Sequence, residues 1–459
     1  MKKFSFALIL FALVSLMMGG GAFAYDQTDH VKMAPNGEGD LLFFPWYLTA
    51  SGGWQTQVSV VNTSSTFSTV AKVVVRSHNW SDELLDFLVY LSPNDVWTGY
   101  VRTGAQGTYI YSDDDSVLVS KPASAMQATD VATYFASPTN PVSQPLFAVK
   151  CPAASKIDNK TDSTDNGYIE VIEVDSTDGL GAGKLPKSTV FNWYEGYSGS
   201  PTSRPMVTHN ILTGYQEFQN TDTGSYSALT RAQVFADWKN QTFQGTGANT
   251  GLVSVANNKI GELEAAMAKS SVAMPYIWQG AAATLHFFTF PTKLSYAMKD
   301  SGATSPCDTL LTSGVTGLGD YFVRAGVPSK CITYTSTGYD MKENTVTSGP
   351  FSGGGTTLKM CQEMEWFPAY IPGDLFTAGW IRYNWTPNTT SFNNIAGTVP
   401  NSFTGAPVLA STVYIRSASV SQADAAWTRS GVSVGVVGGT STTVPTVYPY
   451  YQYSDTVNP

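Results

Sequence analysis

The segment from Asp162 to Glu173 (DSTDNGYIEVIE) carries oxygen-bearing side chains at the spacing of a calcium loop. Asp162, Thr164 and Asn166 occupy alternate positions, Gly167 is the sixth residue and Glu173 is the twelfth. Carboxylate, hydroxyl and amide oxygens at such a spacing can surround one Ca²⁺ ion. The pattern therefore indicates weak calcium binding by Asp162, Thr164 and Asn166, and no cofactor other than calcium is expected.

The residues that flank this segment favour a different interpretation. No amphipathic helix precedes Asp162, Thr164 stands where an acidic ligand belongs, and the residues that follow have the composition of a strand. In a strand, Glu170 and Glu173 point to opposite faces and cannot both reach one ion. We therefore expect a polar turn that leads into a strand, and the weak calcium site is the alternative.

Two tryptophans stand in loop-like contexts, in a chain of which aromatic residues make up 13%. Trp54 follows Gly52 and Gly53, and Trp80 follows Asn79. Exposed aromatic rings can stack on the faces of sugars, so Trp54 and Trp80 are the candidates for glycan binding. Packing in the core explains most of the other aromatic residues.

No catalytic motif is assembled in the sequence. Residues 431–435 (GVSVG) match the nucleophile-elbow pattern of serine hydrolases, but all four histidines precede them and a downstream histidine is required. His286 alternates with aromatic residues and is expected to lie in the core. Glu363 and Glu365 share one face of a strand and are expected at a solvated edge, and no carboxylate pair stands out as that of a glycosidase.

The four cysteines predict disulfide bonds. An even number of cysteines in an exported chain favours pairing, and we expect Cys331 to pair with Cys361 and Cys151 with Cys307. Free buried thiols are the alternative. No two cysteines are spaced as C-x-x-C, which argues against a zinc knuckle, a thioredoxin-like site or covalent haem attachment.

The N-terminus has the pattern of a cleavable export signal. The positive start MKK precedes an apolar run over residues 4–18, and small residues follow at Ala22 and Ala24. We assign residues 1–24 to a signal peptide, so that the mature chain begins at Tyr25 outside the cytoplasm. The net charge of -9 and the low content of lysine and arginine argue against nucleic acid as a partner.

Short alternating strands predict a mainly-β fold of antiparallel, sandwich-like regions. Ala71, Val73 and Val75 alternate with polar residues, and strands are also expected over residues 168–174, 283–290, 379–385, 408–417 and 431–437. Helical patterns occur over residues 228–239 and 259–269, which gives a short helical insertion near 228–269. We expect an N-terminal sandwich-like domain over residues 25–177 and a C-terminal β-rich region over residues 178–459.

Several sequence blocks occur in a characteristic order. They include FFPWY, VVNTSS, LDFLVYLSPNDVWTGY, GYIEVIEV and FTFPTK, and they are most specific between Leu41 and Val101. In this order they resemble a group of uncharacterised secreted bacterial proteins that has no assigned activity. The resemblance implies a secreted β protein and transfers no catalytic residue.

These observations lead to three expectations for function. The first is a secreted or cell-surface structural or interaction protein without catalytic activity, whose partner is itself, another surface component or a polysaccharide. The second is an extracellular carbohydrate-binding protein or glycosidase. The third is an outer-membrane β-barrel, although the chain ends in Asn458 and Pro459 and carries an expected internal helix.

Overall fold

The structure is a computed structural model of the 459-residue chain. It describes residues 31–49, 53–78, 81, 83–104, 107–112, 114, 116, 142–145, 164–195, 207–227, 229–238, 260–277, 282–292, 332–341, 344–346, 358–360, 362–369, 378–385, 389–391, 402–416, 426–429 and 432–435. Of the described residues, 63% lie in strands and two helices occur among them. The predicted mainly-β fold with a short helix is therefore confirmed.

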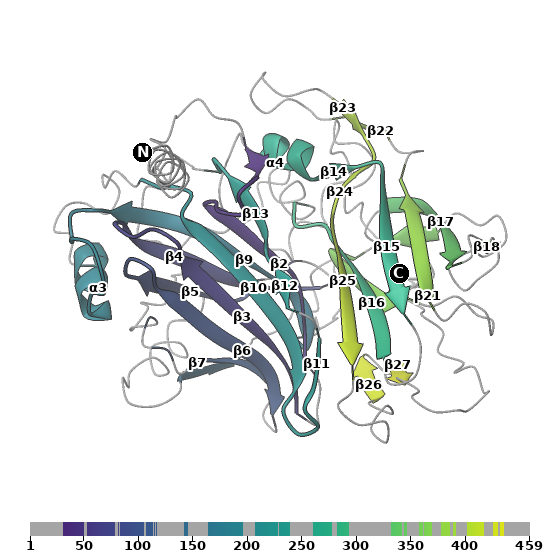
Figure 1. Cartoon of the computed structure of the whole chain (residues 1–459), viewed down its shortest axis with the longest axis horizontal. Helices are drawn as coiled ribbons and strands as arrows, with labels where there is room; N and C mark the ends of the chain where they lie inside the picture. The colour runs from purple at the N-terminus through teal and green to yellow at the C-terminus, as the bar shows by residue number, and fades with distance from the viewer. Residues whose placement is uncertain are drawn as a thin grey trace, which may run out of the picture.

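The six-stranded sheet contains most of the first half of the described chain. Its strand order is β1-β13-β2-β9-β4-β5, and all neighbours are antiparallel. In Figure 1 its strands lie on the left in purple to teal, together with strands of a second sheet in the same colours. Its strands are β1 (Lys32–Met33), β2 (Leu41–Leu48), β4 (Ser68–Ser77), β5 (Glu83–Leu91), β9 (Asn166–Thr177) and β13 (Gln233–Ala236).

A second sheet, here called the long sheet, joins the two halves of the chain. Its order is β20-β16-β25-β11-β10-β3-β6-β7-β8, with β12 paired to β10. Its strands are β3 (Trp54–Asn62), β6 (Val96–Gly104), β7 (Gly107–Ser112), β8 (Val142–Pro145), β10 (Leu212–Asn220), β11 (Ser225–Ser227), β12 (Thr230–Arg231), β16 (Ala282–Thr289), β20 (Met364–Pro368) and β25 (Leu409–Arg416). The junction lies where β11 pairs with β25.

A third sheet, here called the outer sheet, packs on the second half of the long sheet. It has the order β15-β21-β17-β18, with β19 paired to β17. These strands are β15 (Ser271–Ile277), β17 (Ile332–Asp340), β18 (Thr345–Val346), β19 (Leu358–Met360) and β21 (Ala378–Asn384). Two-stranded pairs are formed by β14 (Ala268–Lys269) with β24 (Ala406–Pro407), β22 (Thr389–Ser391) with β23 (Ser402–Thr404), and β26 (Ala426–Arg429) with β27 (Val432–Gly435).

The first core lies between the six-stranded sheet and the β10-β3-β6 part of the long sheet. Alternate residues of each strand point into it because successive side chains of a strand face opposite ways. Ala71, Val73 and Val75 of β4 are fully buried there, as their alternation predicted. Other members are Leu42, Phe44, Val58, Val60, Val101, Ile169 and Val171.

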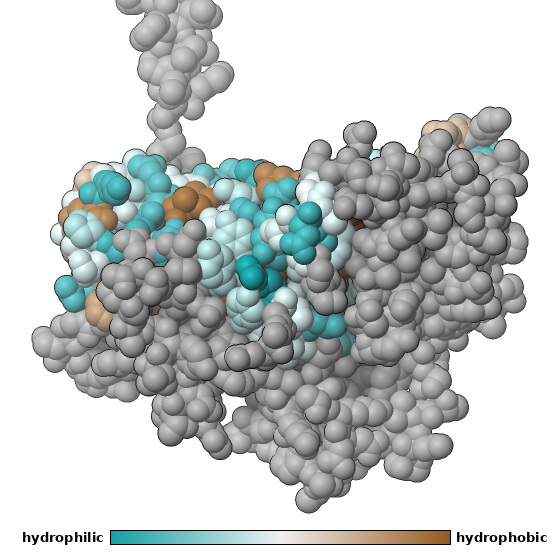
Figure 2. All heavy atoms as spheres, turned by 90° about the horizontal axis from the view of Figure 1, so that it is seen from below, coloured by the Kyte–Doolittle hydropathy of each residue, from teal (hydrophilic) through white to brown (hydrophobic). Residues whose placement is uncertain are grey.

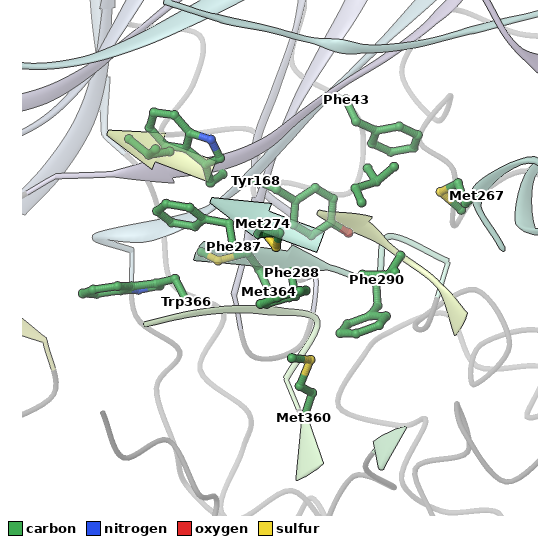
Figure 3. Packing of buried hydrophobic residues seen from close by; sticks show 14 of the residues in the cluster. Phe43, Tyr168, Met267, Met274, Phe287, Phe288, Phe290, Met360, Met364 and Trp366 are labelled. Atoms are coloured by element: carbon green, nitrogen blue, oxygen red, sulfur yellow. The ribbon is translucent and has the colours of Figure 1, made fainter. Parts of the chain in front are cut away.

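The second core is aromatic and collects residues from both halves of the chain, as Figure 3 shows. Phe43 and Tyr168 of the six-stranded sheet meet Phe287, Phe288 and Phe290 near β16 in the same cluster. A register shift in β2 between Phe44 and Tyr47 directs Trp46 toward β16, where its ring stacks on Phe287 at 5.1 Å. The FFPWY block thus connects the two halves.

The two helices pack at different places: α3 lies against β4 and β5, and α4 lies between β1 and β24. Helix α3 (Lys187–Glu195) packs Val190 and Tyr194 against Val70, Tyr90 and Val174. Helix α4 (Ile260–Met267) buries Leu263 and Met267 in the second core, and the helix predicted over residues 259–269 is confirmed. Among the described residues, neither helix has the length and apolar character needed to cross a membrane.

The helix predicted over residues 228–239 is wrong. Its described part forms β12 and β13, with β13 paired to β2 through Val234 and Phe235. Ladder bonds to β2 and burial of these side chains outweigh the weak local preference for helix.

The boundary expected near Thr177 falls inside a continuous structure. β10 pairs with β3 along nine positions, from Leu212 with Asn62 to Asn220 with Trp54, and β13 extends the sheet that holds β2. Strands that follow Thr177 therefore complete both sheets of the first half.

Candidate functional site

The predicted calcium segment is described only from Thr164 onward, and Asp162 lies outside the described residues. The Thr164 carbonyl accepts a hydrogen bond from the Tyr47 hydroxyl at 3.2 Å. Asn166 is buried at the start of β9, where its amide donates to the Asp165 carboxylate. Gly167 is required because a Cβ atom there would lie 1.9 Å from the Arg76 carbonyl oxygen of β4. The described part thus has the form of a polar turn entering a strand.

The metal alternative gains no support from the described residues. They contain no group of three or more histidine, cysteine, aspartate or glutamate side chains placed to hold an ion. Glu170 and Glu173, which the segment would offer, have different partners, Arg76 and the backbone of His209. Weak calcium binding through Asp162, Thr164 and Asn166 remains a prediction.

The expected exposure of Trp54 is wrong. Its side chain is only 5% exposed, and its ring stacks on Phe218 at 4.7 Å. Trp54 starts β3, where its backbone pairs with Asn220, so its ring packs against the neighbouring strand instead of extending from a loop. Trp80, the other predicted glycan ligand, lies outside the described residues.

All four cysteines lie outside the described residues, so the pairing of Cys151 with Cys307 and of Cys331 with Cys361 remains a prediction. The ladder between β17 and β19 does include the neighbours Ile332 and Met360 as register partners. Peptide mapping without reduction tests the pairing of the cysteines directly.

Sequence reasoning missed a cluster of four buried carboxylates around residues 207–210, here called the pinned loop. Each of these four consecutive residues donates a hydrogen bond to a different carboxylate. The pairs are Val207 N with Asp175 (3.0 Å), Thr208 Oγ1 with Asp40 (3.1 Å), His209 N with Glu173 (3.1 Å) and Asn210 Nδ2 with Asp237 (2.8 Å). Glu173 and Asp175 belong to β9, whereas Asp40 and Asp237 come from two distant loops, so no spacing within one segment predicts the cluster.

Glu173 is a buried acid of this cluster with a strongly shifted pKa. Burial, followed by the nearby charge of Asp40, raises the pKa of Glu173 to about 8. Its Oε1 atom accepts from the His209 amide, and this hydrogen bond partly opposes the rise. Glu173 is thus a protonated acid at neutral pH beside the carboxylate of Asp40.

The same cluster contains a serine next to a histidine. Ser176 Oγ lies 2.7 Å from Nδ1 of His209 and donates to the Val207 carbonyl at 2.8 Å. A hydroxyl has one proton, so with Val207 as its acceptor Ser176 receives the Nδ1 proton of His209. A nucleophilic serine requires the opposite arrangement, with the histidine as acceptor. The imidazole also stacks on Phe67 at 4.0 Å, and the pair therefore fastens the pinned loop to β9.

A second polar cluster lies on the opposite side of β9. Glu170 receives the guanidinium of Arg76, with 3.0 Å from Nε to Oε1, and both side chains are buried. Arg76 also donates to the Ser81 carbonyl at 3.3 Å.

Glu363 and Glu365, expected at a solvated edge, are buried instead because β20 pairs with β16 inside the second core. That expectation is wrong.

His286 connects the long sheet to the outer sheet. Its Nδ1 lies 2.9 Å from the Tyr383 hydroxyl and its Nε2 lies 2.9 Å from the Pro275 carbonyl. Burial lowers the pKa of His286 to about 4, so the ring is neutral, donates to Pro275 and accepts from Tyr383. The prediction of a core histidine with satisfied hydrogen bonds is confirmed.

The side of the outer sheet that faces away from the long sheet, here called the outer face, carries a different kind of cluster. The rings of Tyr339 and Trp380 stack at 4.1 Å with an interplanar angle of 11°, and Arg382 Cζ lies 5.3 Å from the centre of the Trp380 ring. Further members of this face are Pro275, Thr337 and Asn384. Pro275 and Arg382 are exposed and the others are half-buried.

Large exposed apolar side chains are scattered over the described residues. The large ones among the described residues belong to separate segments, and they are Met33, Val96, Val207, Leu229, Ile277 and Met341. On the side seen in Figure 2, the brown residues are separated from one another by teal and white ones. The outer face is an organised cluster of aromatic rings with an arginine. Another such cluster lies on β6 and β7, where the rings of Tyr100 and Tyr111 are 5.6 Å apart and Arg102 Cζ lies 5.4 Å from the centre of the Tyr109 ring.

Comparison with known proteins identifies no relative: no family model, no curated protein and no solved structure matches this chain.

Proposed function

We propose that the chain is an exported protein of the cell surface or extracellular space that binds a partner through its outer face and carries out no catalysis. The supporting observation is the ordered stack of Tyr339, Trp380 and Arg382 on a solvent-facing side of the outer sheet. Aromatic and arginine side chains are the residues that most often anchor binding partners.

The buried acids support a role in binding over one in catalysis. Asp40, Glu173, Asp175 and Asp237 each hold one residue of the pinned loop, and Glu170 is paired with an arginine. Acids that are occupied with backbone and side-chain donors in this way stabilise the fold. These buried acids of the described residues thus stabilise the fold.

Export is the second part of the proposal, and it has its own test. The chain would be produced from Met1 in a bacterial host that has an export pathway, and the cell fractions would be separated. We expect a mature product that begins at Tyr25 in the periplasm or medium. A product that still begins at Met1 in the cytosol would contradict export.

The binding part is tested with purified, labelled mature protein and intact bacterial cells. Replacing Trp380 and Arg382 together by alanine should weaken binding by roughly tenfold, the scale of a lost anchor. Leu229→Ser is the matched control because it changes an exposed side chain outside the outer sheet. Unchanged binding by the Trp380→Ala/Arg382→Ala variant, with a melting temperature like that of the original chain, would overturn the proposal.

A further inference from the structure

We propose that the outer face binds an acidic polysaccharide, meaning a polymer whose sugar units carry carboxylate groups. This inference rests on the proposed function and specifies the partner. It follows from the shape, the side-chain chemistry and the charge of the outer face.

The outer face is a regular surface built from strand pairs in register. Pro275 pairs with Trp380, which in turn pairs with Tyr339, and the next outward row contains Arg382 and Thr337. Alternate residues of a strand lie roughly 6.6 Å apart along its direction, so adjacent rows form a continuous, shallow surface. A surface of this kind fits an extended polymer that lies along it.

The aromatic stack supplies a rigid apolar ridge on this surface. Trp380 stacks on Tyr339 and has Arg382 over its ring, so its position is fixed before any ligand arrives. Tyr339 and Trp380 are half-buried, and sugar rings present C–H faces that can pack on the exposed part of such an aromatic surface. An anchor that is already ordered loses little conformational entropy on binding.

The side chains around the ridge suit a ligand rich in hydroxyl groups. Thr337 and Asn384 belong to the outer face, and Thr335 and Ser271 flank Asn384 in register and are exposed. Hydroxyl and amide side chains both donate and accept hydrogen bonds, as sugar hydroxyls do. Among the large exposed apolar residues, the outer sheet contributes Ile277 alone among its described strands.

Charge selects an acidic polymer over a neutral one. The chain has a net charge of -9, but the outward positions of β15, β17 and β21 that the structure describes hold no carboxylate and include Arg382. A polyanion is therefore repelled by the molecule as a whole and attracted at this face. The planar guanidinium of Arg382 can donate two parallel hydrogen bonds to one carboxylate.

The adjacent edge of β15 is closed, which favours binding through the face. His286 donates to the Pro275 carbonyl, and the Thr284 hydroxyl bonds both the amide and the carbonyl of Ile277. Proline has no amide proton to offer an added strand. A peptide that pairs with this edge would have to displace these contacts, so strand addition is disfavoured here.

Affinity electrophoresis of the full mature chain tests the inference, with polygalacturonate or a neutral cellulose ether cast into the gel. We expect retardation by polygalacturonate that decreases with salt, and little by the neutral polymer. Trp380→Ala should weaken binding by roughly tenfold and Arg382→Gln by about threefold, whereas Trp380→Phe and the control Leu229→Ser should retain it. Arg382 and Leu229 are exposed and Trp380 is half-buried, so the melting temperature of each variant is measured to confirm that the fold is retained.

The outcomes separate the two proposals. No retardation by polygalacturonate, equal retardation by both polymers, or unchanged retardation of Trp380→Ala would each overturn the polysaccharide inference. With any of these outcomes, the proposed function would still stand, with another partner, if the variant Trp380→Ala/Arg382→Ala bound cells more weakly than the original chain. Loss of cell binding after protease treatment of the cells would identify a protein partner and would also overturn the inference.

Discussion

The two cores at the ends of the long sheet are built from different side chains. The first core is mainly valine, leucine and isoleucine and holds a single tryptophan, Trp97. The second core holds five tryptophans and four methionines, many of them from loops, from α4 and from strands far apart in sequence. An aliphatic core can be assembled from regular alternation in neighbouring strands. An aromatic core depends on contacts between distant segments, which alternation alone does not specify.

The largest expected effect tests this contrast by removing one side chain from each core. Phe288 contacts the rings of Phe367, Tyr383 and Trp385 at 5.4, 4.8 and 5.8 Å. Phe288→Ala should lower the free energy of unfolding by about 4 kcal/mol, and Val73→Ala in the first core by about 2 kcal/mol. Urea denaturation followed by tryptophan fluorescence measures both free energies of unfolding. Equal losses of stability in the two variants would contradict the expected difference between the two cores.

The next effect concerns the buried ion pair between Arg76 and Glu170, which lie on neighbouring strands of the six-stranded sheet. Arg76→Ala leaves the carboxylate of Glu170 buried without its cation and should cost about 3 kcal/mol. Adding Glu170→Gln should restore most of this loss because the second change removes the stranded charge. A double-mutant cycle by urea denaturation measures the coupling, and simple additivity of the two losses would contradict a direct pair.

The sequence predicted the parts of the fold in which local pattern and long-range packing agree. β4, β9 and β16 alternate apolar and other residues, and each lies where its pattern placed it. The helical pattern of residues 228–239 is weak. Pairing of β13 with β2 outweighs it in the described part of this segment. Trp54 next to two glycines looked exposed, but its ring has a partner 164 positions later in the chain, Phe218.

The sites were less predictable than the strands because they depend on contacts between segments that are distant in the sequence. The pinned loop brings together Asp40, Glu173, Asp175 and Asp237 from three separate regions, and no spacing within one segment reveals them. The outer face is formed by strands whose order in the sheet differs from their order in the chain. Its stack of Tyr339 on Trp380 exists only after β17 pairs with β21.

The two halves should also differ in how they respond to pH, and the first half is sensitive on the alkaline side. The pKa of Glu173 is raised from 4.5 to about 8, so the folded state keeps a proton that the unfolded state releases. The contribution of Glu173 to stability is complete below pH 4.5 and decreases as the pH rises toward 8, by up to about 1.4 kcal/mol per pH unit.

Glu173→Gln tests this alkaline sensitivity because glutamine keeps an acceptor for the His209 amide and cannot ionise. The variant should lose less stability than the original chain between pH 5 and 8, measured by urea denaturation at each pH. Asp222→Asn is the control, since it removes an exposed carboxylate in the turn between β10 and β11. An identical pH profile for Glu173→Gln and the original chain would contradict a protonated Glu173.

The second half should be sensitive on the acidic side, through His286. Burial lowers its pKa from 6.5 to about 4, so the unfolded state gains a proton more readily than the folded state. Its contribution to stability is complete above pH 6.5 and is lost as the pH falls toward 4, over a narrower range than for Glu173. The groups that face the ring are the Tyr383 hydroxyl, the Pro275 carbonyl and the Phe367 ring, and none of them is an anion that would favour a charged imidazole.

Two variants separate this titration from loss of the contact itself. His286→Gln removes the proton-accepting ring and keeps an N–H group for Pro275, so the decrease in stability between pH 6.5 and 4 should become smaller. Thr284→Val breaks the neighbouring hydrogen bonds to Ile277 without removing a titratable group, so it should lower stability by a similar amount at every pH. If both variants kept the acidic decrease of the original chain, His286 would not be its source. The acidic decrease would then have to arise from other groups.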